Sequence, residues 1–466
     1  MLDGMKSQAV VSFLLVFGLV VIASSCGKGP DSRLAGSWRG KERNGWIPVR
    51  LQGGPARIGF QHGFLLALEI ADALAVEKLL LTHDTKRDWI FLRAAAEKVL
   101  WPRVEEEYRQ ELQGVADGLA ARGVKADVWD LVVLNANLEL SYYTKWLDKS
   151  TTPAAPERCS AFVATGSWTR DGNPVIAHNN WSGYLEGSRW NVIFDIRPER
   201  GHRILMDGMP GLIHSGDDFG MNDAGIAITE TTIGSFHGFD PTGVPEFVRA
   251  RKAMQYSASI DDFDRIMREG NNGGYANTWL VADVKRNEIA RLELGLKNVT
   301  LARTKDGVFV GANFPIDPKL IAEETDFPAN DPGRSACARR TRWDQLVAEF
   351  KGRIDLETAK RFLADHEDAF EKKAGAPSER TLCGHVELSP RGMKPWQDEF
   401  GPAGTVQAKA ADAGMVERME LDAAMGHPCG LDFSAAEHLA HHPEYAWQKP
   451  LLRDLPSRPW TRFAAP

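Results

Sequence analysis

Cys159 has the residue type and the sequence context of a nucleophile. It follows a proline-rich segment that ends at Arg158, and it stands at the head of a strand-like run that reaches Thr165. A turn-rich stretch then leads into a second strand-like run that ends at His178. We therefore predict a hairpin that brings His178 back towards Cys159. A free cysteine is more often a small buried hydrophobic residue than a nucleophile, so this pairing alone does not establish catalysis.

Four motifs, in order along the chain, resemble those of the phospholipase B-like family and its relatives, the acyltransferases that process penicillin precursors. They are Cys159-Ser160-Ala161-Phe162 with Ala177-His178-Asn179-Asn180-Trp181, then Pro210 to Phe219, Glu230 to Gly234, and Tyr275 to Asp283. Gly63, Glu111 to Gly118 and Asn135 are similar to the propeptide side of the acyltransferases. The resemblance implies an N-terminal-nucleophile (Ntn) hydrolase. Its expected fold class is α+β, a four-layer αββα sandwich with an N-terminal helical segment.

The resemblance also implies a zymogen that cuts itself. Cys159 would attack the carbonyl of Arg158, and hydrolysis of the resulting thioester would free the amino group of Cys159. A thiol with a pKa near 8.5 is mostly protonated at neutral pH, so a nearby proton acceptor is needed. The freed α-amino group, with a reference pKa of roughly 7.7 to 8.0, provides one. His178 is then expected to be a positioning or autocleavage residue rather than the general base.

Asn277 matches the family's asparagine at the head of a central strand. Its side-chain amide is expected to donate a hydrogen bond to the oxyanion that develops during acyl transfer. Without the family, the same residue would be interpreted as the cap of a turn. Thr231 and Thr232 match a pair in which one hydroxyl faces the nucleophile. Because strand side chains alternate, only one can do so, and we assign Thr231.

Trp181, Asp217 and Asp218 are the remaining candidates, as residues that contact the substrate or position other groups. Adjacent side chains on a strand point to opposite faces, so the two aspartates are not expected to act together on one bond. Either one of them orients the Cys159 amino group, or they are a structural and a solvated carboxylate.

The other cysteines give no clear chemistry. His385 and His427 lie near Cys383 and Cys429 in the sequence, but their spacing is not typical of zinc ligands. We therefore predict no metal site and no cofactor. One disulfide among Cys337, Cys383 and Cys429 is open from the sequence, with Cys383 to Cys429 as one pairing.

The elements that must position these residues change character at Cys159. Apolar residues recur at helical spacing through most of 47–158, which we predict to be a helical propeptide or small chain. Residues 159–466 form the predicted catalytic chain, where strands and helices come in runs rather than in strict alternation. The predicted strands are 159–165, 174–178, 190–196, 225–231, 278–283, 288–294 and one over 401–409. The predicted helices are 245–258, 260–268, 336–350 and 356–366.

The first residues predict export. Lys6 precedes an apolar run over 9–23 that is short for a membrane span and ends in small residues before Cys26. Residues 1–26 therefore resemble a signal peptide with a bacterial lipobox, which would place a lipid on Cys26. We expect a protein of the bacterial cell envelope, held at the membrane by that lipid, with 27–46 as a tether. Ordinary signal cleavage and a short uncleaved anchor remain alternatives.

Composition narrows the classes of function. The formal charge of −7, without a stripe of Lys and Arg, argues against nucleic acid as a partner. The leading hypothesis is a cysteine hydrolase that cleaves a nonpeptide amide or acyl ester of a small acyl-amide or lipid-like substrate. A phospholipase B-like deacylase, an acyl-CoA-dependent N-acyltransferase and a noncatalytic ligand-binding lipoprotein are the alternatives. A papain-like peptidase would carry its cysteine on a helix. The run after Cys159 has the pattern of a strand, which argues against this class.

Overall fold

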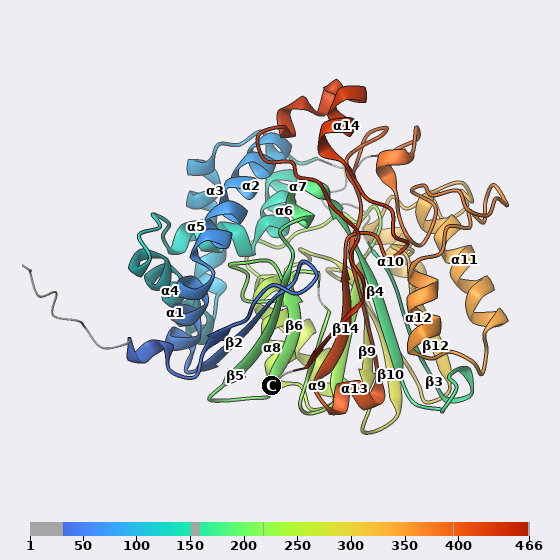
Figure 1. The fold of residues 1–466 in the computed structure, drawn as a ribbon, viewed down its shortest axis with the longest axis horizontal. Coiled ribbons are helices and arrows are strands. Elements are labelled where there is room, and N and C mark those ends of the chain that lie inside the picture. The colour runs from blue at the N-terminus through green and yellow to red at the C-terminus, as the bar shows by residue number, and fades with distance from the viewer. Residues whose placement is uncertain (1–30, 151–158, 218, 395, 465–466) are drawn as a thin grey trace, which may run out of the picture.

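Two β-sheets stack face to face at the centre of the computed structural model, which describes residues 31–150, 159–217, 219–394 and 396–464 (Figure 1). Within these residues the larger sheet has the order β1-β2-β5-β6-β7-β8-β9-β10-β11 and the smaller sheet the order β12-β3-β4-β13-β14-β15. The larger sheet comprises β1 (Trp38–Arg39), β2 (Ile47–Gly53), β5 (Val192–Pro198), β6 (Ile204–Gly208), β7 (Gly220–Asn222), β8 (Ile226–Thr232), β9 (Asn277–Asp283), β10 (Glu288–Leu294) and β11 (Val299–Thr304). The smaller sheet comprises β12 (Gly307–Gly311), β3 (Ser160–Thr165), β4 (Val175–Gly183), β13 (Ala403–Asp412), β14 (Glu420–Met425) and β15 (Thr461–Ala464).

Alternating side chains on the strands divide the core into layers. On β3, Ala161 and Val163 point inward and share a buried cluster with Leu280 of β9, so this cluster lies between the sheets. Phe162 points the other way and packs against Trp343 on the outer side of the smaller sheet. Both faces of β3 are therefore buried, one by the other sheet and one by helices.

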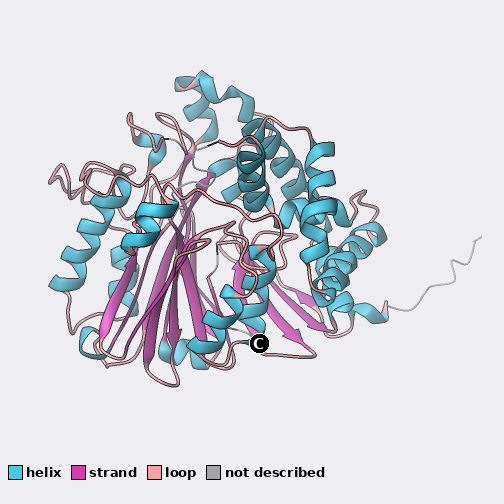
Figure 2. Cartoon of the chain, turned by 180° about the vertical axis from the view of Figure 1, so that it is seen from behind, coloured by secondary structure: helices cyan, strands magenta, loops and turns pink. Residues whose placement is uncertain are grey.

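Helices cover both outer faces, as the view from behind shows (Figure 2). The larger sheet is covered by N-terminal helices together with α8 and α9, and the smaller sheet by α11 and α12. The α-helices are α1 (Pro55–Leu65), α2 (Ala67–Thr85), α3 (Trp89–Ala95), α4 (Glu106–Ala121), α5 (Val128–Asn135), α6 (Asn137–Leu147), α7 (Tyr184–Gly187), α8 (Glu246–Tyr256), α9 (Ile260–Arg268), α10 (Pro318–Glu324), α11 (Ser335–Glu349), α12 (Leu356–Leu363), α13 (Ala413–Glu417) and α14 (Ala435–His441). The predicted α+β class and its four αββα layers are confirmed.

Glycines let α1 and α4 pack backbone to backbone. A Cβ on Gly59 would lie 1.9 Å from the carbonyl oxygen of Glu111, and one on Gly63 would lie 2.0 Å from that of Val115. Gly118 on α4 faces α1 in the same way. Gly63 and Gly118 are among the residues that resemble the propeptide side of the acyltransferases, and this close approach explains why glycine is needed there.

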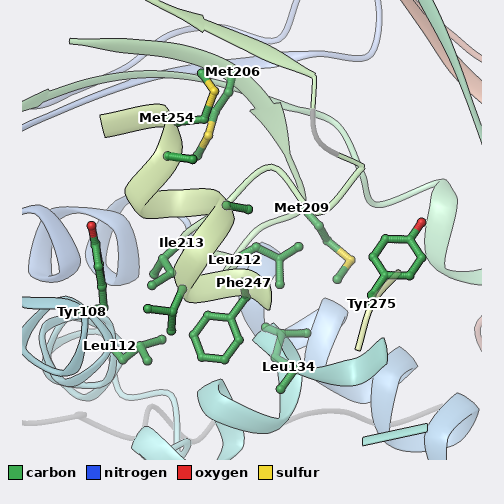
Figure 3. Close-up of a cluster of buried hydrophobic side chains, with 14 of the residues drawn as sticks. Tyr108, Leu112, Leu134, Met206, Met209, Leu212, Ile213, Phe247, Met254 and Tyr275 are labelled. Atoms are coloured by element: carbon green, nitrogen blue, oxygen red, sulfur yellow. The ribbon is translucent and has the colours of Figure 1, made fainter. Parts of the chain in front are cut away.

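The N-terminal helices share one core with the section after Cys159. In Figure 3, side chains of α4 and α5 meet the loop after β6 and the helix α8 in one buried cluster. Its labelled residues are Tyr108, Leu112, Leu134, Met206, Met209, Leu212, Ile213, Phe247, Met254 and Tyr275. This core holds the helical section against the sheets independently of the covalent connection between them.

The segment before α1 differs from the expected tether and helix. Trp46 is fully buried, and β2 pairs in parallel with β5 in the larger sheet. Ile47, Val49 and Leu51 are buried and alternate with more accessible residues, which is the period of a strand rather than of a helix. The structure therefore places two segments of 38–53, β1 and β2, in the larger sheet.

The predicted elements after Cys159 are present, with small shifts at their ends. The strand predicted over 278–283 is β9, and the helix predicted over 245–258 is α8. In the described part of the chain, no helix has both the length and the apolar character to cross a membrane. The predicted signal segment and Cys26 lie outside the described residues.

Candidate active site

Cys159 lies at the head of β3, with only 1% of its surface exposed. Its φ of 84° is in the left-handed region that non-glycine residues rarely occupy and that recurs at functional sites. The predicted hairpin is confirmed, because β3 and β4 pair antiparallel with Ala161 opposite His178. This register places Asn180, rather than His178, beside Cys159. The Sγ of Cys159 lies 4.0 Å from the Oδ1 of Asn180.

Arg339 of α11 fixes the backbone at Cys159. Its Nη1 donates to the carbonyl oxygen of Cys159 at 2.5 Å and to the Oγ of Ser160 at 3.1 Å. Its Nη2 donates to the Oδ1 of Asn313 at 2.7 Å, and its guanidinium lies over the ring of Trp181 at 4.2 Å. Arg339 is fully buried, and this burial lowers its pKa to about 9. This buried cation therefore fixes the backbone position of Cys159 and Ser160 at the start of β3.

The thiol of Cys159 favours its neutral form. Burial raises its pKa well above the usual value, and the negative charges of Glu230 and Asp217 raise it further. The backbone N–H of Trp181 and the charge of Lys409 act in the opposite direction without cancelling this rise. A nucleophilic thiolate at this position therefore requires a proton acceptor at the moment of attack.

Asn277 stands at the head of β9, as the sequence predicted, but its amide is engaged. In the orientation that satisfies both of its side-chain atoms, the NH2 donates to the Oε2 of Glu230 at 2.9 Å and to the carbonyl of Ala276 at 3.0 Å. The hydroxyl of Tyr275 donates to the other oxygen of Glu230 at 3.1 Å. Donation from Asn277 to an oxyanion, which stays a prediction, would require one of these bonds to be exchanged.

Thr231 and Thr232 point in opposite directions. The hydroxyl of Thr232 pairs with that of Tyr275 at 2.6 Å, away from the smaller sheet. Thr231 faces the smaller sheet, since a Cβ on Gly311 would lie 2.7 Å from its Oγ1. That hydroxyl has no hydrogen-bond partner among the described residues. Gly311 pairs with Ala161, two residues after Cys159, so Thr231 is the member of the pair on the side of Cys159.

A buried lysine links the two sheets beside this site. Lys409 of β13 lies opposite His178 in the strand register, and its Nζ lies 3.1 Å from the Oδ2 of Asp207 on β6. It also bonds to Asp217, which accepts a hydrogen bond from the Oγ of Ser215 at 2.8 Å. Lys409 and both carboxylates are at most 3% exposed. The cluster therefore joins the strand that pairs with β4 to the loop that carries Asp217.

The two carboxyl groups around Lys409 titrate differently. Burial, with the charge of Asp217 added, raises the pKa of Asp207 to about 8. Burial opposes ionisation of Asp217 as well, but the charge of Lys409 lowers the pKa of Asp217 below its usual value. Near neutral pH the cluster thus contains one ammonium group, one carboxylate and one protonated carboxyl group.

His178 is a neutral side chain without a polar partner. Burial lowers its pKa well below the usual value, and the charge of Lys409 adds to this effect. Neither ring nitrogen has a hydrogen-bond partner among the described residues, and the ring stacks on Phe219 with centroids 6.5 Å apart. This environment argues against His178 as the general base.

The helical section positions the loop that ends at Asp217. Asn135 of α5 donates to the carbonyl of Gly211 at 2.9 Å and accepts from the backbone N–H of Ile213 at 2.8 Å. The Nε2 of His62 on α1 accepts from the N–H of Gly211 at 2.9 Å. Two side chains from the predicted propeptide therefore hold a loop of the section after Cys159.

Sequence reasoning missed several residues around Cys159. Lys409 and Glu230 each stand in a stretch with no other charged residue, and this was the signal that could have singled them out. Nothing in the sequence distinguishes Arg339 from nearby arginines, because only the fold buries it. Arg158 and Asp218, both predicted site residues, lie outside the described residues.

A largely apolar cavity lies at the end of α6. It has a volume of about 800 Å³, and its lining includes Tyr142, Trp146 and Phe239. The buried hydroxyl of Tyr142 is close enough to Ala276 and Glu230 for both to affect its pKa, which burial raises. Cys159 itself does not line this cavity.

Comparison with known proteins confirms the predicted resemblance. The model of the family described as phospholipase B matches residues 81–308. Putative phospholipase B-like 2 of Caenorhabditis elegans is 26% identical over 41% of this chain. The 40 kDa form of acyl-coenzyme A:6-aminopenicillanic-acid-acyltransferase of Emericella nidulans is 26% identical over 48%, and an uncharacterized protein of Archaeoglobus fulgidus is 26% identical over 57%. The matches cover 35%, 57% and 45% of those three proteins, so the chain spans roughly a third to just over half of each relative's length.

Two mutant structures of conjugated bile acid hydrolase from Clostridium perfringens also align with this chain. They are 10% and 11% identical over 57% of it, and the alignments cover 88% and 89% of those chains. The TM-scores are 0.32 and 0.34. At such scores, the four-layer architecture rests on the sheets and helices described above.

Proposed function

We propose that this chain, a relative of the phospholipase B-like proteins, is an Ntn-type cysteine acyl hydrolase that cleaves a nonpeptide amide or acyl ester. The position of Cys159 carries the proposal. Its buried thiol stands at the head of an inner strand, between two sheets, on a backbone held in the left-handed region. Arg339 donates a hydrogen bond to the carbonyl oxygen of Cys159 at 2.5 Å. A purely structural thiol would not need this strain and this buried cation.

The activating step is cleavage between Arg158 and Cys159. Before cleavage, the nitrogen of Cys159 is an amide and cannot accept a proton from the thiol. Afterwards it is an amine beside the sulfur, which supplies the proton acceptor that the raised pKa of the thiol requires. The core shared by α4, α5 and α8 would keep both products of the cut together.

Turnover then follows from the groups around Cys159. The sulfur attacks the substrate carbonyl, and the α-amino group takes the thiol proton. The same proton passes to the leaving amine or alcohol as the carbon–nitrogen or carbon–oxygen bond breaks, which leaves a thioester on Cys159. Water hydrolyses the thioester and restores the thiol. Asn277, after exchanging one of its bonds, would stabilise the oxyanion of both steps.

The apolar cavity lined by Tyr142, whose hydroxyl Glu230 and Ala276 influence, is the proposed binding place for the acyl group. Its aromatic lining suits a hydrocarbon chain, and Lys145 and Lys149 on its lining would contact an acidic or polar end. A lipid-like or fatty acyl-amide substrate therefore fits better than a small hydrophilic one.

Acyl transfer is the second candidate function. The relative in Emericella nidulans is named as an acyltransferase that uses acyl-coenzyme A, and it matches 48% of this chain. In such a reaction the same thioester would be resolved by an amine instead of water. Adding a primary amine to the assay separates the two, since a transferase would yield the new amide and a hydrolase the free acid.

Intact-mass spectrometry of the wild type beside Cys159→Ala tests the proposal. We expect two wild-type fragments that meet at Arg158 and Cys159, and one uncut chain in the variant. Matched panels of N-acyl amides, acyl esters and phospholipids then identify the bond that is cleaved. A folded wild type that stays uncut would remove the amine base. The chain would then be better explained as a ligand-binding lipoprotein.

We also propose that the protein is exported and held at the bacterial envelope by a lipid on Cys26. The apolar run over 9–23 and the small residues before Cys26 support this. Membrane fractionation and N-terminal mass analysis of wild type and Cys26→Ser test it. A mature N-terminus without lipid would contradict the anchor.

A further inference from the structure

A second group of cysteines and histidines gathers far from Cys159 in the sequence. His366 follows α12, and Cys383 and His385 lie in the long loop before β13. Cys429 follows β14. In the sequence their spacing did not indicate a metal site, but folding brings one ligand atom from each within 4.8 Å of all the others. Three separate segments therefore converge on one point.

The distances match the edges of a tetrahedron around a zinc ion. The Nε2 of His385 lies 3.5 Å from the Sγ of Cys383 and 3.5 Å from the Sγ of Cys429. It lies 3.2 Å from the Nε2 of His366. Zinc bonds of about 2.3 Å to sulfur and about 2.0 to 2.1 Å to nitrogen give tetrahedral edges of about 3.5 Å between S and N and about 3.3 Å between two N atoms.

Hydrogen bonds among the four groups do not explain this arrangement. The Nε2 of His385 faces another ring nitrogen and two sulfurs, and one hydrogen cannot serve three partners. A disulfide between Cys383 and Cys429 would leave both imidazoles facing each other, and the structure has both cysteines as free thiols. A cation at the centre satisfies all four groups at once.

Neighbouring residues fix His385 in the orientation of a ligand. Its Nδ1 lies 2.8 Å from the Oε1 of Glu387, a carboxylate that also accepts from the hydroxyl of Tyr184 at 2.6 Å. With the ring proton on Nδ1, the Nε2 lone pair points at the cluster, the usual partnership of carboxylate, histidine and metal. His427 stacks on His385, but its Nδ1 and Nε2 already pair with Leu431 and Tyr184. His427 is therefore a packing neighbour rather than a ligand.

We propose that His366, Cys383, His385 and Cys429 form a Cys2His2 site for a zinc ion. Binding would release the two thiol protons and form two Zn–S and two Zn–N bonds, without any change of oxidation state. Four protein ligands leave no position for water or substrate, so the site is structural rather than catalytic. It is independent of the function proposed for Cys159.

The site would tie the loop over 364–402 to the loop after β14. Gly384, between two of the ligands, packs directly on Trp181, where a Cβ would come within 2.1 Å of the ring. Trp181 in turn lies under Arg339. The metal would thus brace the loop behind the aromatic ring that supports the nucleophile strand, and its loss would loosen this support without removing a catalytic group.

Metal analysis of the full chain, purified under mild reductant, tests the proposal. We expect about one zinc per chain in the wild type and a loss of most of it in Cys383→Ser and Cys429→Ser. Cys337→Ser is the matched control, since this buried thiol lies 3.9 Å from two backbone carbonyls and outside the cluster. A folded wild type without bound metal would overturn the proposal, as would an equal loss in the control.

A cobalt experiment covers the case in which the serine variants do not fold. Wild-type protein treated with a chelator and then with Co²⁺ should show the thiolate-to-cobalt absorption of a tetrahedral site with two sulfur ligands. Cys159→Ala should show the same bands, because its thiol lies outside the cluster. Absence of the bands in both proteins, or a Cys383–Cys429 disulfide in the protein purified under reductant, would overturn the zinc site.

Discussion

Two regions of this molecule combine cysteine with histidine, and they differ in what surrounds the sulfur. Cys159 is a single thiol among charges of both signs, and the nearest histidine along the paired strand has no polar contact with it. Cys383 and Cys429 meet two imidazoles at tetrahedral distances, with one carboxylate behind. The first environment suits a group that must gain and lose a proton, and the second suits groups that share a cation. Residue type alone does not separate a nucleophile from a ligand.

The backbone shows the same contrast. Cys159 begins an inner strand in a left-handed conformation, with its carbonyl held by Arg339. Cys383 lies in the long loop before β13 and Cys429 follows β14, and neither has a left-handed backbone. The strained backbone at Cys159 and the convergence of four ligand atoms at Cys383 and Cys429 indicate different functions.

Replacing Cys159 by alanine gives the largest expected effect. Acyl turnover should fall by at least about 10³-fold, because within the described part of the chain no other thiol lies beside Asn180 to form the thioester. Metal content and Tm should remain near the wild-type values. Activity assays on the intact-mass samples check this. Residual turnover near the wild-type rate would mean that Cys159 and the cysteine cluster had been assigned the wrong roles.

Arg339→Lys should lower turnover by about 10- to 100-fold, because lysine keeps the charge but loses the fork that reaches Cys159, Ser160 and Asn313 together. Arg340→Lys is the matched control, since Arg340 is the next residue along α11 and its guanidinium pairs with Asp344 at the surface. Steady-state kinetics of both variants check this. Equal effects in the two variants would show that position next to the strand, rather than these bonds, matters.

Removing the proposed metal should give a smaller effect on catalysis than on stability. Prolonged chelation is expected to lower the Tm clearly, while kcat falls only a few-fold, because the cluster supports Trp181 without touching the thiol. Thermal melts and kinetics with and without restored zinc check this. An unchanged Tm together with abolished turnover would reverse the roles of the two regions.

Asp207→Asn should change how stability depends on pH. The folded-state pKa of Asp207 is raised to about 8, so the stability it contributes is present below pH 4 and is lost as the pH rises through 8. Asparagine does not ionise, so the Tm of the variant relative to the wild type should rise from pH 5 to pH 9. Thermal melts at each pH check this.

Asp195→Asn is the control with the opposite sign. Burial opposes ionisation of Asp195, but hydrogen bonds from Arg203 and its neighbours lower its pKa. Its contribution to stability is therefore present above pH 4 and lost as the pH falls through the folded value, so the variant should be least stable, relative to the wild type, at neutral pH. Parallel trends in both variants would contradict the protonation states given for the Lys409 cluster.

Local patterns predicted the elements well where one period dominated. The hairpin of β3 and β4, the strand at Asn277 and the helix α9 are in the expected places. The strand β2 was missed because its alternation lies next to a long helical stretch. The choice of Thr231 over Thr232 agrees with the direction of the side chains, since alternation on a strand is a local rule.

The sequence by itself placed Cys159 at the head of a strand, and it determined the fold class and the motifs that resemble the phospholipase B-like family. Only the tertiary structure decided which arginine reaches Cys159, that Lys409 bonds to Asp207 and Asp217, and that four metal-type ligands meet. These contacts join residues up to about two hundred positions apart. Periodicity and motifs record only neighbours along the chain, whereas burial and pairing depend on which segments the two sheets bring together.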